Sequence, residues 1–270
     1  MKGEPYIRLG FFLGMLIVMA LWETIAPRRR LTSSKSVRWF SNLALVLLNS
    51  AAVRIGFAVG AVGVAIESQR LGWGLFNNVA VPGWLAVLLS VVALDFVLYL
   101  QHVMFHAVPL LWRLHMVHHA DPDFDVTTGV RFHTLEIGLS MGIKAVAILL
   151  LGAAPIAVLI FEVLLNATSM FSHSNVRMPK WLDGILRLVV VTPDMHRVHH
   201  SELVEETNSN YGFNLSWWDF LLGTYRPKPK EGHDHMRIGV AEIPRNRAVW
   251  LHWLLILPFV SPRRSGEDNS

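Results

Sequence analysis

Long apolar blocks constrain what this chain can fold into more than any other feature of its sequence. They run from about residue 9 to 26, 43 to 66, 84 to 100 and 137 to 170. A helix of about 20 apolar residues spans a bilayer while satisfying its own backbone hydrogen bonds. Only 16% of the residues are charged, against about 25% in soluble proteins. The sequence therefore predicts an all-α membrane protein rather than a soluble domain with a large core.

The first and last of these blocks need separate interpretation. The first ends at Pro27 and three arginines with no small-residue cleavage site before them, so we expect a retained span rather than a signal peptide. The last is longer than one span requires, and residues 152–155 (Gly-Ala-Ala-Pro) interrupt it. We expect a helical hairpin there that enters and leaves the membrane on the same side. A shorter apolar piece, 249–260, is expected to lie at the membrane interface or against the bundle, and a polar tail follows Pro262.

Basic residues indicate the orientation of the spans. Five lie in segment 27–38 and one, Arg70, lies in segment 67–83. Because Lys and Arg collect in short cytoplasmic segments, we expect 27–38 in the cytoplasm and 67–83 outside. The third span then returns to the cytoplasm near Gln101, and the hairpin leaves the rest of the chain there. Since the basic residues flank apolar blocks and form no stripe, the net charge of +4 does not indicate nucleic-acid binding.

Thirteen histidines, beside no cysteine, are the strongest indication of chemistry. The lack of cysteine excludes disulfides, iron–sulfur clusters, thiolate nucleophiles and zinc sites that use sulfur. Ten of the histidines lie between positions 102 and 200, close to the expected cytoplasmic end of the third span. The other three, His233, His235 and His252, are expected to be ordinary surface or packing residues.

Eight of these ten histidines form three compact boxes. The first box has the spacing H-x3-H and the other two have H-x2-H-H, so on a helix the members of a box share a face. Imidazoles crowded on one face repel when protonated and need partners when neutral, and a bound metal supplies a partner to all of them. The members are His102, His106, His115, His118, His119, His196, His199 and His200, and His133 and His173 lie between the second and third boxes.

The number of imidazoles indicates how many metals they hold. Eight to ten are too many for one ion, but they suit two ions with four or five ligands each. Imidazole binds zinc, copper, iron and nickel, so the ligand type leaves the metal open. The zinc-protease pattern H-E-x-x-H is absent, as is the Glu and Glu-x-x-His pattern of soluble carboxylate di-iron bundles. The boxes therefore predict a histidine-rich centre with two metals.

In this order and around membrane spans, the boxes resemble those of the membrane di-iron fatty acid hydroxylase / sterol desaturase superfamily. The resemblance covers roughly residues 84–227, and the segments 115–133, 192–201 and 210–225 are similar to its bacterial sterol-desaturase-like branch. It implies about four transmembrane helices, two plus hairpin pairs, under a cytoplasmic histidine-rich helical cap. It also implies three regions: an N-terminal membrane anchor region (1–83), a fatty acid hydroxylase-like domain (84–227) and a C-terminal interfacial segment with the polar tail (228–270).

The same resemblance implies two iron ions, O2 as co-substrate, and hydroxylation or desaturation of a lipid from the bilayer. That lipid would be a fatty acyl chain, a sterol or a related compound. The family's metal ligands correspond directly to the eight box histidines, and His133 and His173 would complete a set of ten. The choice between hydroxylation and desaturation, and the oligomeric state, stay open at this point.

Carboxylates near the boxes are candidates to orient the ligands. Asp95 lies two helical turns before His102 on the same face and is the main candidate for a hydrogen bond to a ligand. Glu136 is expected either to orient His133 or to cap the next span. Four more carboxylates flank the second and third boxes, with turn formation or helix capping as their alternative role: Asp121, Asp123, Asp125 and Asp194.

Electrons must come from another protein, because the chain has no glycine-rich dinucleotide motif and no cysteine. A ferredoxin, a cytochrome b5-like protein or a reductase is the expected donor, and the bacterial inner membrane is the expected location. Two alternatives belong to other classes: a metal-binding membrane electron carrier with haem between paired histidines, and a divalent-metal transporter. The carrier would place single histidines deep on facing spans, and the transporter would place ionisable groups along the middle of several spans.

Overall fold

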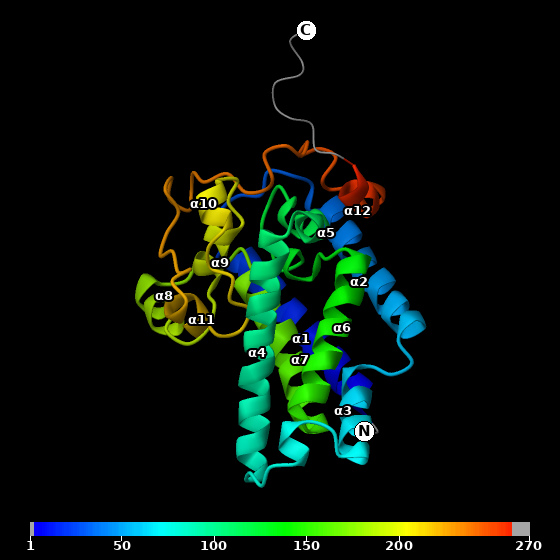
Figure 1. Cartoon of the computed structure of the whole chain (residues 1–270). Coiled ribbons are helices and arrows are strands. Elements are labelled where there is room, and N and C mark those ends of the chain that lie inside the picture. The colour runs from blue at the N-terminus through cyan, green and yellow to red at the C-terminus, as the bar shows by residue number, and fades with distance from the viewer. Residues whose placement is uncertain (1–2, 261–270) are drawn as a thin grey trace.

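The computed structural model describes residues 3–260, and within this range the regular elements are helices without strands (Figure 1). Five described segments are long and apolar enough to cross a membrane. They are α1 (Glu4–Ile25), α2 with α3 (Lys35–Gly56 and Ala61–Leu71), α4 (Gly83–Ala107), α6 (Thr134–Leu151) and α7 (Pro155–Ser172). The all-α fold class is confirmed, and the five helices fit a multi-pass membrane protein.

The second of these segments is broken rather than continuous. α2 ends at Gly56 and α3 begins at Ala61, so residues 57–60 leave the helix. Gly56 and Gly60 flank the break, and glycine is a poor helix former. α3 packs closely against α6 and α7 because the buried residues that it presents, Ala61 and Ala65 among them, are small.

The predicted hairpin is confirmed as α6 and α7. Gly152 ends α6 with a left-handed φ of 64°, which favours glycine, and Pro155 opens α7 at a position where its missing N–H costs nothing. Gly74, before the short turn η1 (Leu75–Asn77), packs onto this corner so closely that a Cβ on it would lie 2.1 Å from the Gly152 nitrogen. The corner therefore holds the two arms antiparallel, with both open ends at the other end of the bundle (Figure 1).

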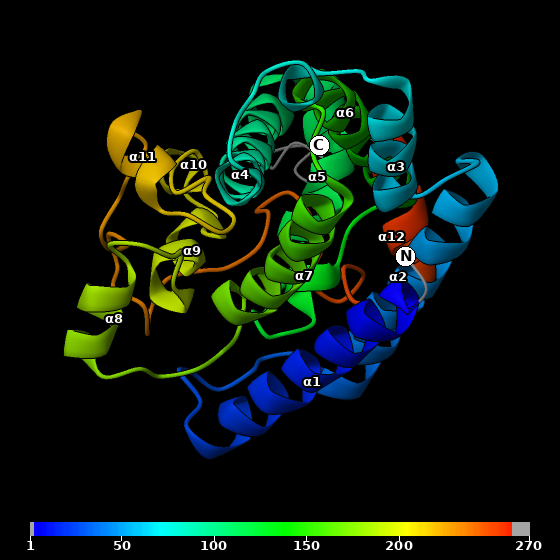
Figure 2. The same ribbon diagram turned by 90° about the horizontal axis from the view of Figure 1, so that it is seen from below.

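The hairpin is the centre of the bundle. α4 packs against both of its arms, and the apolar side chains buried between them include Leu98, Met141 and Phe161. α1 lies along the outside of α7, where Met19 and Met170 share a second apolar cluster (Figure 2). This packing holds the ends of α4 and α7 next to each other.

Short helices form a cap at the end of the bundle where α4 ends and α6 begins, and α8 (Lys180–Leu186) and α11 (Trp217–Leu221) extend it down the side of α4 (Figure 1). The others are α5 (Pro109–His119), η2 (Thr128–Val130), α9 (Pro193–His199), α10 (Val204–Thr207), α12 (Leu251–Ile256) and η3 (Leu257–Phe259). α12 packs against α2 and η3 against α5, so the apolar piece 249–260 lies against the bundle. The polar tail expected after Pro262 lies outside the described residues.

The basic connection between α1 and α2 is attached to this cap. The Arg28 guanidinium lies 3.2 Å from a carboxylate oxygen of Asp194, beside the third box. The backbone N–H groups of Thr32 and Ser33 donate to Asp123, which follows the second box. The segment that the charge pattern assigns to the cytoplasm therefore lies at the same end of the molecule as the boxes.

Candidate metal centre

Four helix ends bring the histidines together. His102 and His106 occupy the last two turns of α4, and the second box occupies the last turns of α5. The third box lies at the end of α9, where His200 is the capping residue after the helix, and His173 directly follows α7. Nine of the ten predicted ligands meet at this junction.

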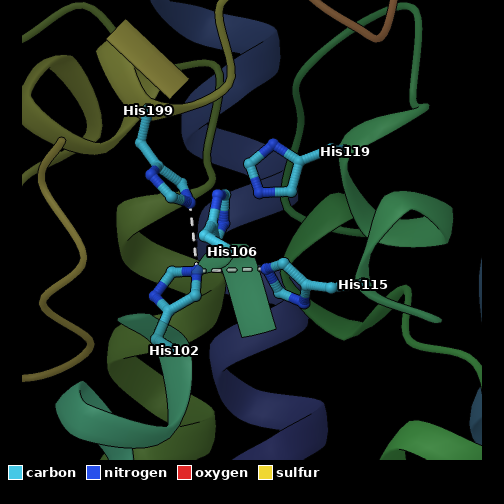
Figure 3. Close-up of side chains that lie close together, drawn as sticks. All are labelled: His102, His106, His115, His119 and His199. Atoms are coloured by element: carbon cyan, nitrogen blue, oxygen red, sulfur yellow. Dashed lines mark hydrogen bonds between the residues drawn. The ribbon is translucent and has the colours of Figure 1, made fainter. Parts of the chain in front are cut away.

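The nine side chains form two groups, and within each group one nitrogen per ring lies within 4.8 Å of all the others. Group A consists of His102, His106, His115, His119 and His199 (Figure 3). Group B consists of His118, His173, His196 and His200. Each box keeps its residues four apart in the same group, since such residues share a helix face. The third member of each triple box, His118 or His199, joins the other group, so the three rings do not all share one face as the spacing predicts.

Hydrogen bonds set the tautomers in group A. The Nδ1 atoms of His102, His115 and His199 each lie 2.7 Å from an oxygen, and these oxygens belong to Tyr211 (backbone), Glu136 (side chain) and Ser209 (backbone). Each Nδ1 therefore carries the proton and each Nε2 carries a lone pair. Yet the His102 Nε2 lies 3.0 Å from the Nε2 atoms of both other rings (Figure 3). Lone pairs that face one another at this distance repel unless a cation lies among them.

The spacing of these nitrogens suits a metal. Imidazole nitrogens bind transition metals at about 2.1 Å, and two of them at right angles are then about 3.0 Å apart. The observed separations of 3.0 Å match this value. The group A rings therefore fit a metal ion in the region toward which the Nε2 atoms point.

Group B repeats this arrangement. The Nδ1 of His173 lies 2.7 Å from the Ser169 carbonyl oxygen and that of His118 lies 3.3 Å from the Arg131 carbonyl oxygen, while their Nε2 atoms are 3.1 Å apart. In both groups, other rings have buried nitrogens that find no hydrogen-bond partner within the described part of the chain. Both nitrogens of His119, His196 and His200 and the Nε2 of His106 are of this kind. Burying such groups unpaired is costly, and a metal in each group would satisfy them.

Burial keeps the cap imidazoles neutral. It lowers the pKa of His115 and of His173 to about 3. Burial, followed by the repulsion of neighbouring imidazoles, also lowers the pKa of the other cap ligands well below its ordinary value of 6.5: His118, His119, His196, His199 and His200. The neutral ring is the form that binds metal, so the folded cap presents its ligands ready for loading.

The structure does not bring His133 into either group, unlike the other nine predicted ligands. This residue caps the N-terminus of α6: its Nδ1 accepts from the Leu135 N–H at 3.2 Å. Its Nε2 then carries the proton and donates to the Leu255 carbonyl at 3.2 Å. With both nitrogens engaged in capping and packing, His133 has no lone pair free for a metal.

The main carboxylate candidate, Asp95, has its hydrogen-bond partners away from the predicted ligands. Asp95 touches no described histidine; its carboxylate accepts from the backbone N–H groups of Asn214 and Leu215 and from the Trp218 indole. It thus holds the segment after the third box against α4. Instead, the carboxylate that forms a hydrogen bond with a predicted ligand is that of Glu136. This residue was expected beside His133, but its carboxylate contacts the His115 ring. Sequence spacing provides no signal for that contact, because the two residues belong to different helices.

A buried ion network beneath the second box was also missed. Arg38, on α2, is fully buried, and its guanidinium lies 2.6 Å from carboxylate oxygens of both Asp121 and Asp125. Although burial alone would raise the pKa of Asp121, Arg38 and Arg131 lower it to about 2. Arg38 was counted as part of a basic cytoplasmic segment, whereas it ties that segment to the loop that follows the second box.

One cavity reaches group A from the cap. It has a volume of about 540 Å³, and its lining includes His106 at the end of α4 and Trp112, Val204, Asn208 and Glu242 from the cap. His106 is the only group A ring that is not fully buried. A small molecule in this cavity would therefore touch the first box before any other part of the centre.

Comparisons with known proteins bear on this centre. Residues 87–224 match the family model "Fatty acid hydroxylase". The chain is 31% identical over 225 residues to ornithine lipid hydroxylase OlsE of Rhizobium tropici, an alignment that covers 81% of this chain and 67% of that relative. It is 32% identical over 143 residues to human alkylglycerol monooxygenase (53% of this chain, 30% of the relative) and 26% identical over 151 residues to human cholesterol 25-hydroxylase (52% and 51%). The chain thus spans about half or less of these last two relatives. No solved structure matches the chain.

Proposed function

The chain belongs to the fatty acid hydroxylase family, and from this premise we propose that it is a membrane-bound non-haem di-iron oxygenase. It hydroxylates or desaturates a lipid, which is a fatty acyl chain, a sterol or a related compound, with O2 and electrons from another protein. The observation that carries the proposal is the set of Nε2 lone pairs facing one another at 3.0 Å in group A and 3.1 Å in group B. Two cations account for this arrangement, and the relatives are lipid hydroxylases and monooxygenases by name.

Nine histidines hold the two ions in this proposal. Group A supplies five ligands and group B supplies four, and His133 is left out because its nitrogens are already engaged. When bound, the two irons supply the oxidising power toward an unactivated C–H bond that side chains lack.

The protein's own residues orient these ligands and keep water out. The backbone oxygens of Tyr211 and Ser209 and the Glu136 carboxylate hold the group A rings in place through their Nδ1 atoms. On the group B side, the Phe132 ring stacks on His118 with centroids 4.5 Å apart. Apolar rings around such a centre limit its access to solvent and so protect it from side reactions.

The proposal also covers the electron donor and the orientation of the cap. A ferredoxin, a cytochrome b5-like protein or a reductase would dock on it, because the chain carries no second redox motif of its own. The cap would face the cytoplasm, in a bacterial inner membrane. Support comes from the basic segment 27–38, which the positive-inside rule assigns to the cytoplasm and which contacts the cap through Arg28 and Arg38.

The alternatives from other classes are less well supported. A haem carrier needs isolated histidines on facing spans, whereas these nine crowd at helix ends. A transporter needs ionisable groups that line a path. The Lys144 and Glu162 side chains within the hairpin instead form an ion pair with each other at 2.8 Å. Arg8 forms a second ion pair with Glu162 at 3.0 Å.

Metal analysis combined with lipid profiling tests the proposed function. The full-length protein is produced in cells grown with iron-57, purified in detergent, and examined by elemental mass spectrometry and Mössbauer spectroscopy, while the lipids of the same cells are compared by mass spectrometry. We expect two high-spin irons per chain and a lipid that has gained one oxygen atom or lost two hydrogens. His252→Ala, which changes an imidazole outside both groups, is the matched control and should behave as wild type. Folded protein that binds no iron, or iron-loaded protein that leaves the lipids unchanged, would refute the proposal.

A further inference from the structure

We propose that Glu136 makes the two metal sites unequal, by positioning His115 and giving group A a tighter hold on its metal than group B has. This inference rests on the proposed two-metal centre. It concerns one carboxylate on α6 and the single ligand that it touches.

The contact is close and enclosed. The Oε1 of Glu136 lies 2.7 Å from the Nδ1 of His115, and the two residues are only 3% and 1% exposed. The other carboxylate oxygen of Glu136 is buried and has no hydrogen-bond partner within residues 3–260. When a metal is bound in group A, an ionised Glu136 would direct its charge at His115, and through that ring at group A.

Every other oxygen that accepts from a ligand ring is neutral. In group A these are the backbone oxygens of Tyr211 and Ser209. In group B they are the backbone oxygens of Arg131 and Ser169 and the Ser172 hydroxyl. Within the described chain, the Glu136–His115 pair is thus the one hydrogen bond between a ligand ring and a carboxylate.

A carboxylate in this place acts on one metal more than on the other. Nine neutral imidazoles bring no charge to two divalent ions, so the charge of both remains uncompensated. A hydrogen bond to an ionised acceptor is about twice as strong as a neutral one, and it makes the ring a more basic ligand. Glu136 also attracts the nearer ion directly. Group A already has five ligands against four, and both differences favour group A.

A purely structural role for Glu136 would have a different signature. An amide oxygen in the same place would still accept from the His115 Nδ1 and hold the ring. Glu136→Gln therefore keeps the orientation of His115 and removes the charge. If orientation alone matters, this variant binds metal as wild type does; if the charge matters, one of the two metals is held less tightly.

Iron binding to the full-length protein in detergent is the test. Fe2+ is titrated without oxygen into metal-free protein, and bound iron per chain is measured at each free concentration. For wild type we expect two steps of unequal affinity. For Glu136→Gln we expect one step to weaken by about 10- to 100-fold, the usual effect of losing such a partner, with the other step unchanged. Asp95→Asn is the matched control, since it removes a buried carboxylate that contacts no described histidine, and should leave both steps unchanged.

Backgrounds with only one intact group show where Glu136 acts. In His118→Ala, which disables group B, adding Glu136→Gln should weaken the remaining iron by about 10- to 100-fold. In His199→Ala, which disables group A, it should change nothing. Equal weakening in both backgrounds, or in neither, would overturn the inference.

If Glu136→Gln does not fold, Glu136→Asp takes its place, since it keeps the charge but moves it back by one methylene. We expect a smaller loss of iron affinity that is confined to group A. A loss of affinity in both groups would be the contrary result. Wild-type protein that binds no iron would instead count against the proposed function itself.

Discussion

Mild acid should destabilise the cap of the metal-free protein far more than that of the loaded protein. Seven of the nine ligands lie outside the membrane-spanning helices, and burial holds the pKa of each well below 6.5: His115, His118, His119, His173, His196, His199 and His200. The unfolded cap therefore binds more protons than the folded cap at any pH below about 6.5. Its free energy of unfolding falls as the pH falls below about 6.5, and the first of the folded rings with a defined pKa, His115 and His173, take up protons only near pH 3.

The size of the effect follows from the number of buried rings. At pH 5.5 a histidine with an unfolded pKa of about 6.5 is about nine-tenths protonated, which favours the unfolded state by about 1.4 kcal/mol for each ring. Seven such rings amount to about 10 kcal/mol. Since a whole domain is stable by about 5–15 kcal/mol, the metal-free cap should lose its structure between pH 6.5 and 5.5.

Thermal unfolding in detergent, followed by tryptophan fluorescence at pH 7.5, 6.5 and 5.5, measures this loss. Metal that binds only the folded cap adds to its stability and competes with the protons, so the loaded protein should keep its midpoint to a pH about one unit lower. His252→Ala should behave as wild type in both forms. An unchanged midpoint of the metal-free protein from pH 7.5 to 5.5 would show that the rings are not buried as neutral groups. An equal fall in both forms would show that they do not hold the metal.

Three further predictions concern single residues. Alanine at His118 or His199 should remove about one metal per chain and abolish lipid oxidation, whereas His252→Ala should change neither; elemental analysis of the purified variants decides this. Arg38→Met removes the arginine that contacts buried Asp125 and leaves Asp121 with Arg131 alone, at 3.9 Å. The loss should cost about 3–5 kcal/mol, seen as a lower unfolding midpoint, while a midpoint within experimental error of wild type would contradict the buried ion network. Gly129→Ala would bring a Cβ to 2.6 Å from a backbone oxygen of α7; we expect the loop after the second box to shift, with a lower midpoint and weaker iron binding in the same variant, and normal values of both would count against this contact.

Local sequence patterns were sufficient for several features that depend on one helix. The apolar blocks predicted the spanning helices, and Gly152 with Pro155 predicted the corner of the hairpin. Residues four apart in a box do share a face, as His102 with His106 and His196 with His200 show. These features follow from helix geometry and backbone preferences, which act over a few residues.

The division of the boxes into two groups required the tertiary structure. His118 and His119 are neighbours in the sequence but point to different groups, because successive residues on a helix face directions about 100° apart. His118 meets His173 and His119 meets His102. This choice depends on how α4, α5 and α7 pack against one another. His133 illustrates the same limit, since its spacing from the boxes resembles that of a ligand while its position caps α6.

The sequence by itself thus determined the fold class, the existence of a histidine-rich centre and eight of its candidate ligands. Only the tertiary structure decided which nine rings come together, that Glu136 rather than Asp95 supports a ligand, and that Arg38 is an interior residue. The reason is physical: hydrophobicity and helical periodicity are local properties, whereas a buried charge is placed by partners that lie far away in the sequence. Arg38 and Asp121 are 83 positions apart, and His102 and His199 are 97 apart. Contacts of that kind exist only once the helices have packed.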